Sequence, residues 1–272
     1  MYFGGLKIDR KWTVVGVLVI LAAVYVFLLA AKNKKDPQLP PAELTDENGE
    51  AVAPAALYGQ ANLLFYCRDD RDAAVLLSVD ADLTGGRIAV SALPDDKEYA
   101  LNGVPVTIGT IYAAGGLEGV KAAAGARFGV DYSRAVICTP RQFISITEAL
   151  GDVTVFAGEE VNYADESIAA NITPGENTLT GEELYVYLRS GAEGEALYRL
   201  QSETFALMLK AYLTPENIEN GEELFNRIVN SSQTDITAYD YAACADRLSA
   251  LASSDTVIYI GTGMIGEDDS AG

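Results

Sequence analysis

The sequence predicts an α/β domain, with a mixed central β-sheet flanked by helices, preceded by one transmembrane helix. Two observations predict this fold. Short apolar runs rich in β-branched residues alternate along the chain with longer runs of helical periodicity, which is typical of a sheet covered by helices. Near the N-terminus, residues 12–31 form an uncharged apolar run of 20 residues, which is long enough to cross the hydrocarbon core of a bilayer.

The first 60 residues divide into three parts. Residues 1–11 are a short basic N-terminus, 12–31 the transmembrane helix, and 32–60 a spacer rich in proline, alanine and acidic residues. The apolar run is longer than that of a signal peptide, so it predicts an uncleaved anchor. Three Lys or Arg residues precede the helix and three follow it, so charge alone leaves its orientation open.

The α/β domain is expected over residues 61–263, followed by a disordered tail over 264–272. A hairpin turn is expected at 83–86, and Gly115–Gly116 interrupts an alanine-rich helix. Thr180 and Glu183 have the spacing of a capping box. The patterns predict strands at 61–67, 74–80, 86–93, 133–139, 153–158 and 256–261, and helices at 109–129, from 140 to the Gly at 151, 179–190, 195–213, 215–231 and 239–252.

One of these helices, 195–213, is amphipathic. Its apolar residues recur near helical spacing, which predicts a side that faces the core. They are Leu197, Leu200, Phe205, Leu207, Leu209 and Tyr212.

Composition excludes several classes of function. The net charge is −20, and beyond residue 35 the chain holds 13 basic and 38 acidic residues. This charge repels phosphate at long range, so nucleic acid is not an expected partner. The chain has no histidine, which removes histidine-based catalysis and histidine metal sites. Cys67, Cys138 and Cys244 show no metal-binding spacing, so buried thiols and at most one disulfide are expected.

Acidic residues follow two predicted strands where a ligand crevice is expected in an α/β sheet. The run 68–72, Arg-Asp-Asp-Arg-Asp, lies between the first two strands, and Asp95–Asp96 follows Pro94 after the third. If these strands are neighbours, Asp72 and Asp96 can approach each other and hold Mg²⁺ together with diphosphate oxygens. The alternative is that they are solvated turn residues, where aspartate is common.

Arginines are scarce enough to be informative. Arg189 ends an apolar helical run, and Arg199 lies ten residues further on. The planar fork of either guanidinium can hold a phosphate group. A surface arginine with an ion-pair partner is the alternative for both.

Several phrases resemble the LytR–CpsA–Psr family of membrane-anchored enzymes of the bacterial cell envelope. They include ANLLFY followed by an aspartate before AVLLSV, the strand-end phrase IAVSALPDD, and FISITEALGDVTV. TPGENTLTGEELYVYLRS resembles the most typical phrase of the family. The resemblance runs from about residue 61 to 215 and is expected to extend to Gly263, and an N-terminal span with a short spacer fits it too.

The resemblance implies an activity and a location. Such proteins transfer a glycopolymer from a polyprenyl-diphosphate carrier to peptidoglycan, with the lipid in an apolar cleft. It also implies that arginines hold the diphosphate and aspartates hold Mg²⁺. The domain is outside the cell membrane in this family, so the N-terminus would be cytoplasmic and the C-terminal domain extracellular. The partners implied are the bilayer, a polyprenyl-phosphate-type lipid, and peptidoglycan or another wall polymer.

The sequence departs from the family at several charged positions. Asp95 stands where the resemblance implies an arginine, and Asp70 stands at a second such position. Arg71 or Arg68 can substitute only from a shifted position. Thr107 replaces a lysine, and Gly191 replaces the arginine that follows Arg189 by two residues. A unit charge at 4 Å is worth roughly 4 kcal/mol at an effective dielectric of about 20, so each reversal matters.

Two hypotheses follow. The first is a cell-envelope transferase with a rebuilt site, in which Arg189, Arg199 and Arg71 serve the diphosphate and Asp72 and Asp96 bind Mg²⁺. The second is a non-catalytic module that keeps the cleft for a lipid or a partner protein.

Overall fold

The computed structural model describes residues 60–68, 75–94, 99–101, 103–148, 150–164, 168–215, 221–238, 240, 249–252 and 257–260. The predicted transmembrane helix, the spacer and the tail lie outside these residues. So do Arg71, Asp72, Asp95, Asp96 and Cys244. No helix within the described ranges is both long and apolar enough to cross a membrane.

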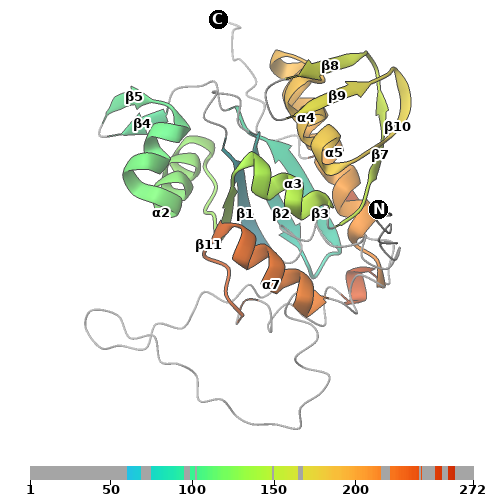
Figure 1. The fold of residues 1–272 in the computed structure, drawn as a ribbon. Helices are drawn as coiled ribbons and strands as arrows, with labels where there is room; N and C mark the ends of the chain where they lie inside the picture. The colour runs from blue at the N-terminus through green and yellow to red at the C-terminus, as the bar shows by residue number, and fades with distance from the viewer. Residues whose placement is uncertain are drawn as a thin grey trace, which may run out of the picture.

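A six-stranded mixed sheet forms the centre of the domain, in the order β11-β6-β1-β2-β3-β12 (Figure 1). β1 pairs antiparallel with β2, and β2 antiparallel with β3. β6 is parallel to β1, and β12 is parallel to β3. The strands are β1 (Gln60–Cys67), β2 (Val75–Asp82), β3 (Arg87–Ala92), β6 (Arg134–Cys138), β11 (Gln233–Thr234) and β12 (Val257–Ile260).

This topology gives the sheet one edge of functional interest. β1, β3, β6 and β12 all run in the same direction, so their C-terminal ends meet at one edge, here called the carboxyl edge. The acidic segments that follow β1 and β3 therefore both leave from this edge. The segment after β1 leads into β2, and the start of β2 lies beside the end of β3, so the two acidic segments join neighbouring strands, as the sequence argument required.

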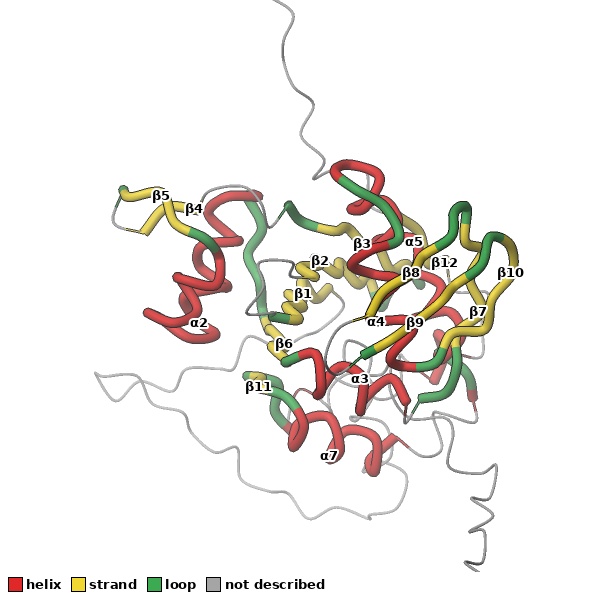
Figure 2. The backbone as a smooth tube through the Cα atoms, turned by 45° about the horizontal axis from the view of Figure 1, so that its top comes forward, coloured by secondary structure: helices red, strands yellow, loops and turns green. Residues whose placement is uncertain are grey.

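Helices cover both faces of the sheet. α2 (Ile108–Phe128) packs on one face with the hairpin β4 (Tyr99–Leu101) and β5 (Val104–Val106) beside it, at one end of the molecule (Figure 1). The other face carries α3 (Pro140–Glu148), α4 (Gly181–Ser190), α5 (Gly194–Tyr212) and α7 (Gly221–Ser231). Figure 2 shows α2 well apart from α4 and α5.

The described residues also form three two-stranded pairs outside the central sheet. β4–β5 is one of them, β7 (Val153–Ala157) pairs with β10 (Gly175–Leu179), and β8 (Val161–Ala164) pairs with β9 (Ala169–Ile172). The sequence analysis predicted β7, but it predicted none of the other five strands. Each is three to five residues long, so it offers too little alternation to be recognised.

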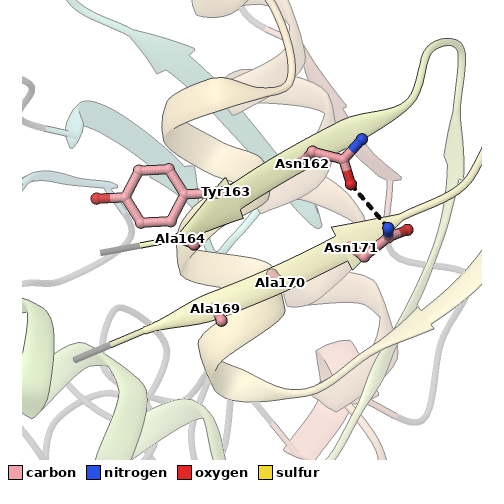
Figure 3. A pocket seen from close by; sticks show the side chains of 6 residues that line it. All are labelled: Asn162, Tyr163, Ala164, Ala169, Ala170 and Asn171. Carbon is pink, nitrogen blue, oxygen red and sulfur yellow. Dashed lines mark hydrogen bonds between the residues drawn. The ribbon is translucent and has the colours of Figure 1, made fainter. Parts of the chain in front are cut away.

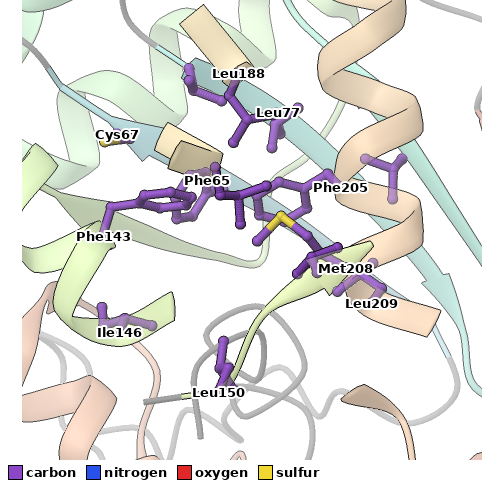
Figure 4. Close-up of a cluster of buried hydrophobic side chains, with 14 of the residues drawn as sticks. Phe65, Cys67, Leu77, Phe143, Ile146, Leu150, Leu188, Phe205, Met208 and Leu209 are labelled. Carbon is purple, nitrogen blue, oxygen red and sulfur yellow. The ribbon is translucent and has the colours of Figure 1, made fainter. Parts of the chain in front are cut away.

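The core on the α3–α4–α5 face is built around aromatic side chains. Phe65 of β1 lies between Phe143 of α3, at a ring-centroid distance of 6.1 Å, and Phe205 of α5, at 5.2 Å. Met208 and Leu209 fill the space beside them (Figure 4). Burying such side chains contributes about 1.5–3 kcal/mol each, so this cluster fixes α3 and α5 on the sheet.

The predicted turns and caps are confirmed. The β2–β3 hairpin turns at residues 83–86, where Asp82 accepts from the backbone N–H groups of Thr84 and Gly85. α4 begins with the predicted capping box, in which Glu183 N–H donates to Thr180 and the Glu183 carboxylate accepts from Thr180 N–H. Gly116, at φ 57° and ψ −147°, interrupts α2 as expected.

The predicted apolar side of α5 is only partly right. Phe205, Leu209 and Tyr212 are buried, but Leu207 is 43% exposed. Polar residues occupy buried positions instead, namely Gln201, Ser202 and Thr204. Hydrogen bonds to α4 and β3 explain why Gln201 and Ser202 replace apolar side chains at their positions.

Candidate functional site

Arg189 lies at the C-terminal end of α4, on the side of the helix that faces α3. Its Nη1 donates to the hydroxyl of Tyr185 at 3.0 Å, and its guanidinium lies 5.3 Å from the centre of that ring. Tyr185 in turn packs against Phe143 of α3. The aromatic contact holds the arginine fork beside the core while the side chain stays half-buried.

Two hydrogen bonds from adjacent residues of α5 tie the end of α4 to the carboxyl edge. Gln201 Nε2 donates to the carbonyl of Leu188 at 2.9 Å, and Ser202 Oγ accepts from Ala92 N–H at 2.8 Å. Leu188 immediately precedes Arg189, and Ala92 is the last residue of β3. Adjacent residues of α5 therefore contact both the residue before Arg189 and the end of the strand from which the Asp95–Asp96 segment leaves.

Gln201 is a functional candidate that the sequence analysis missed. Its side chain is 2% exposed, and its Oε1 has no hydrogen-bond partner among the described residues. The bond to the Leu188 carbonyl requires the amide nitrogen, so it fixes which atom is the remaining oxygen. A buried acceptor of this kind costs about 1–3 kcal/mol unless a ligand or water donates to it. The available signal was a polar residue on the core-facing side of an amphipathic helix.

A hydrogen bond joins the two described residues that flank the segment after β3. The hydroxyl of Tyr99 donates to the carbonyl of Pro94 at 2.9 Å, so the two ends of residues 95–98 are held together. The side chains of Asp95 and Asp96, like those of Arg71 and Asp72, lie outside the described residues. The proposed Mg²⁺ ligands thus remain a prediction, supported only by the shared edge from which both segments leave.

Arg199 lies on a different surface from Arg189. Its side chain is 74% exposed, and its Nε donates to Glu203 at 2.8 Å, one helical turn away. The hydrogen bond to Glu203 raises the pKa of Arg199. Arg199 lines a hollow of about 430 Å³, here called the acidic hollow, and Glu159 and Glu193 line it as well. Tyr187, not Tyr185, faces this hollow, so α4 separates the described contacts of the two arginines.

Arg68 does not join Arg189 in the described structure. Its guanidinium lies 4.8 Å from the centre of the Tyr112 ring of α2. Successive strand residues alternate between faces, and Cys67 belongs to the α3–α4–α5 face. Arg68 is therefore directed to the α2 side of the sheet.

Two departures from the family pattern have local structural reasons. Thr107 is the N-cap of α2, where its Oγ1 accepts from Thr110 N–H at 3.2 Å. Gly191 is the C-cap of α4, and a Cβ there would lie 2.8 Å from both the Tyr187 carbonyl oxygen and Leu200 Cδ1. The Leu200 side chain lies in the space that a side chain at position 191 would need, so an arginine cannot be placed there without a shift of its neighbours.

The buried-thiol interpretation is confirmed for two cysteines. Cys67 and Cys138 are in register on the parallel strands β1 and β6, and both are at most 2% exposed. Burial, and then the neighbouring Cys67 thiol, raise the pKa of the Cys138 thiol. Both are free, and a protonated, buried thiol is a poor nucleophile.

A second hollow does not suit a diphosphate. It has a volume of about 450 Å³ and lies on the β8–β9 hairpin (Figure 3). The Asn171 amide donates to Asn162 Oδ1 at 2.7 Å across the two strands. Its lining residues are alanine, asparagine and Tyr163, with no charged side chain among them.

Comparison with known proteins agrees with the sequence resemblance. The model of the LytR_cpsA_psr family matches residues 45–259. No curated protein sequence matches the chain. Among solved structures, B. subtilis TagV is 16% identical, with a TM-score of 0.61 over 74% of this chain and 84% of that one.

Two further structures share the fold. A putative transcription regulator from Eubacterium siraeum DSM 15702 is 18% identical, with a TM-score of 0.62 over 86% of this chain and 93% of that one. TagT bound to LIIa-WTA is 12% identical, with a TM-score of 0.55 over 75% of this chain and 78% of that one. The family match spans most of the sequence, and the chain therefore belongs to the LytR–CpsA–Psr family.

Proposed function

We propose that this protein acts in the attachment of glycopolymers from a polyprenyl-diphosphate carrier to the bacterial cell wall. Membership of the LytR–CpsA–Psr family supports this function. The similar fold of TagT, solved with LIIa-WTA, supports a lipid-linked wall polymer as the ligand class. The domain would stand outside the cell membrane, anchored by residues 12–31, with the N-terminus in the cytoplasm.

The observation that carries the proposal is the position of Arg189. The hydrogen bonds of Gln201 and Ser202 hold the end of α4 against the carboxyl edge, where the acidic segments after β1 and β3 leave the sheet. We propose that Arg189 binds the diphosphate through its fork, and that Gln201 Oε1 accepts a hydrogen bond from a hydroxyl or a protonated oxygen of the ligand. Arg71 remains a candidate for a second cation from the segment after β1.

Mg²⁺ is the cofactor that this proposal includes. Asp72 and Asp96 would hold it, and when bound it would neutralise charge on the diphosphate oxygens. The described residues contain no group of three acidic, cysteine or histidine side chains placed for a metal ion. The candidate ligands are instead in the segments that leave the carboxyl edge.

A specific observation favours a second candidate function, a non-catalytic module that binds the lipid-linked polymer. Gly191 leaves no room for a second arginine beside Arg189, and Arg199 is ion-paired to Glu203 on the far side of α4. With fewer cations near the diphosphate, stabilisation of a transition state weakens more than binding of an apolar lipid tail.

Turnover by the full chain in lipid nanodiscs distinguishes the two functions. We expect Mg²⁺-dependent transfer from a polyprenyl-diphosphate-linked glycan, lowered about 100-fold or more in Arg189→Ala, since losing one such donor costs that much. Arg227→Ala, an exposed arginine on α7, is the matched control. Lipid binding without transfer in the wild-type protein would favour the module. If Arg199→Ala removes transfer as fully as Arg189→Ala, Arg199 belongs to the same site and the assignment to a separate surface is wrong.

A further inference from the structure

The acidic hollow has an exposed apolar rim. Phe156 is 75% exposed, because alternation along β7 buries Val155 and Ala157 and turns Phe156 outward. It pairs with Glu176 of β10, so it stands on the open face of a two-stranded ribbon. Leu207 of α5, 43% exposed, lines the same hollow. Only three large apolar side chains in the described residues are exposed to this degree, and two of them meet here.

The charge of the hollow is negative. Glu159, Glu193 and Glu203 line it, and Arg199 is the single basic side chain among the described lining residues. Because Arg199 is already paired with Glu203, the other two carboxylates have no cation from the lining. Tyr187 also lines the hollow. Burial, and then the Glu203 carboxylate, raise the pKa of Tyr187, so its phenol adds no charge to the hollow.

Charge selects the occupant. A second copy of this chain carries the same net charge of −20, so it is repelled. An anionic lipid surface is repelled for the same reason. A segment with large apolar side chains flanked by lysine or arginine satisfies both the apolar rim and the carboxylates, which is the complementarity that specific interfaces use.

We propose that the acidic hollow is a docking site for a basic segment of a partner protein, with a large apolar side chain packed between Phe156 and Leu207. The ammonium or guanidinium groups beside that side chain contact Glu159 and Glu193. Arg199 and Glu203 also line this surface, where they form an ion pair with each other. This role is independent of the transfer activity.

Fluorescence anisotropy with the full chain in nanodiscs tests the proposal. The probe is a labelled short peptide of leucine and lysine, compared with one in which glutamine replaces every lysine, at about 0.15 M salt. We expect the lysine peptide to bind and the glutamine peptide to bind at least about tenfold more weakly. Phe156→Ala should weaken binding about tenfold, as expected for an aromatic anchor. The double variant Glu159→Gln/Glu193→Gln should weaken it about fivefold and flatten its salt dependence.

Matched controls separate docking from general attraction to an acidic protein. Val104→Ala removes the third exposed apolar side chain, on β5, and Glu118→Gln removes an exposed carboxylate of α2. Both should bind the lysine peptide as the wild type does. No binding by the wild type, equal losses in Val104→Ala and Phe156→Ala, or equal affinity for both peptides would overturn the proposal. Because the readout needs no transfer, its failure leaves the proposed function untouched.

Discussion

At the residue scale, neighbouring side chains decide what each arginine can do. Arg189 is held beside the core by Tyr185, whereas Arg199 is held on an exposed helix face by Glu203. The sequence shows Arg189 at the end of an apolar run and Arg199 ten residues further on in the next helix, and it cannot separate their roles. The two arginines differ because their contacts lie on opposite sides of α4. The packing of α5 against α4 decides on which side Arg199 lies.

A buried ion pair provides a residue-scale prediction. Asp240 is 3% exposed and accepts from Arg134 Nε at 2.7 Å and from Thr237 N–H at 2.8 Å. Asp240→Ala leaves the Arg134 guanidinium partly buried without its carboxylate, so we expect a loss of about 3 kcal/mol in the free energy of unfolding. Urea denaturation of the full chain measures it. Glu118→Gln removes the exposed partner of Lys121, which keeps its ion pair with Asp235, so it should cost less than about 1 kcal/mol. Equal effects would contradict the assignment.

Buried tyrosines predict a loss of stability in alkali. Burial raises the pKa of Tyr132 to about 12 from 10.0, and burial also raises the pKa of Tyr212. Below pH 10 both states hold the phenol proton, so the contribution is constant. Above pH 10 the unfolded state releases the proton first, so the free energy of unfolding falls until the folded group titrates as well. Denaturation curves between pH 8 and about 11.5 should show this fall, reduced in Tyr132→Phe. An unchanged slope in that variant would contradict the prediction.

At the element scale, two adjacent glycines of α2 should respond in opposite ways. Gly115 is helical with open space where a Cβ would lie, so Gly115→Ala should stabilise the protein by about 0.5–1 kcal/mol. Gly116 has a φ of 57°, so Gly116→Ala should destabilise it by about 1–2 kcal/mol. Thermal unfolding of the two variants beside the wild type measures both. Stabilisation by both changes would mean that α2 runs straight through this point.

Elements with strong local signals were predictable from the sequence. Each of these features depends on residues that are close together in the sequence. They are the capping box of α4, the 83–86 turn and the helices with clear periodicity. The β8–β9 and β10 strands were missed because their pairing is stabilised by packing on α4, which lies further along the chain. The apolar pattern of α5 predicts that Leu207 is buried together with Leu209, but Leu207 is exposed. The buried side of α5 instead includes Gln201 and Ser202, which form hydrogen bonds to α4 and β3.

At the scale of the whole molecule, strand order positions the site. The sequence placed acidic residues at two strand ends but could not give the order β1-β2-β3, which brings the start of β2 beside the end of β3 at the carboxyl edge. Nor could it show that α5 links α4 to β3, since the hydrogen bonds of Gln201 and Ser202 join elements that are far apart in the chain. The described residues leave the predicted roles of Arg71, Asp72 and Asp96 as predictions.

The central claim is that Arg189 and Gln201, at the carboxyl edge, bind the head group of a polyprenyl-diphosphate-type lipid. Mass spectrometry of lipid extracted from the full chain, purified from a bacterial membrane with Mg²⁺ present, tests it most directly. The account predicts a polyprenyl phosphate or diphosphate with the wild type and with Arg227→Ala, and its loss from Arg189→Ala and Gln201→Leu. A wild-type protein without such lipid, or one whose lipid is equally retained in all four proteins, would contradict the claim.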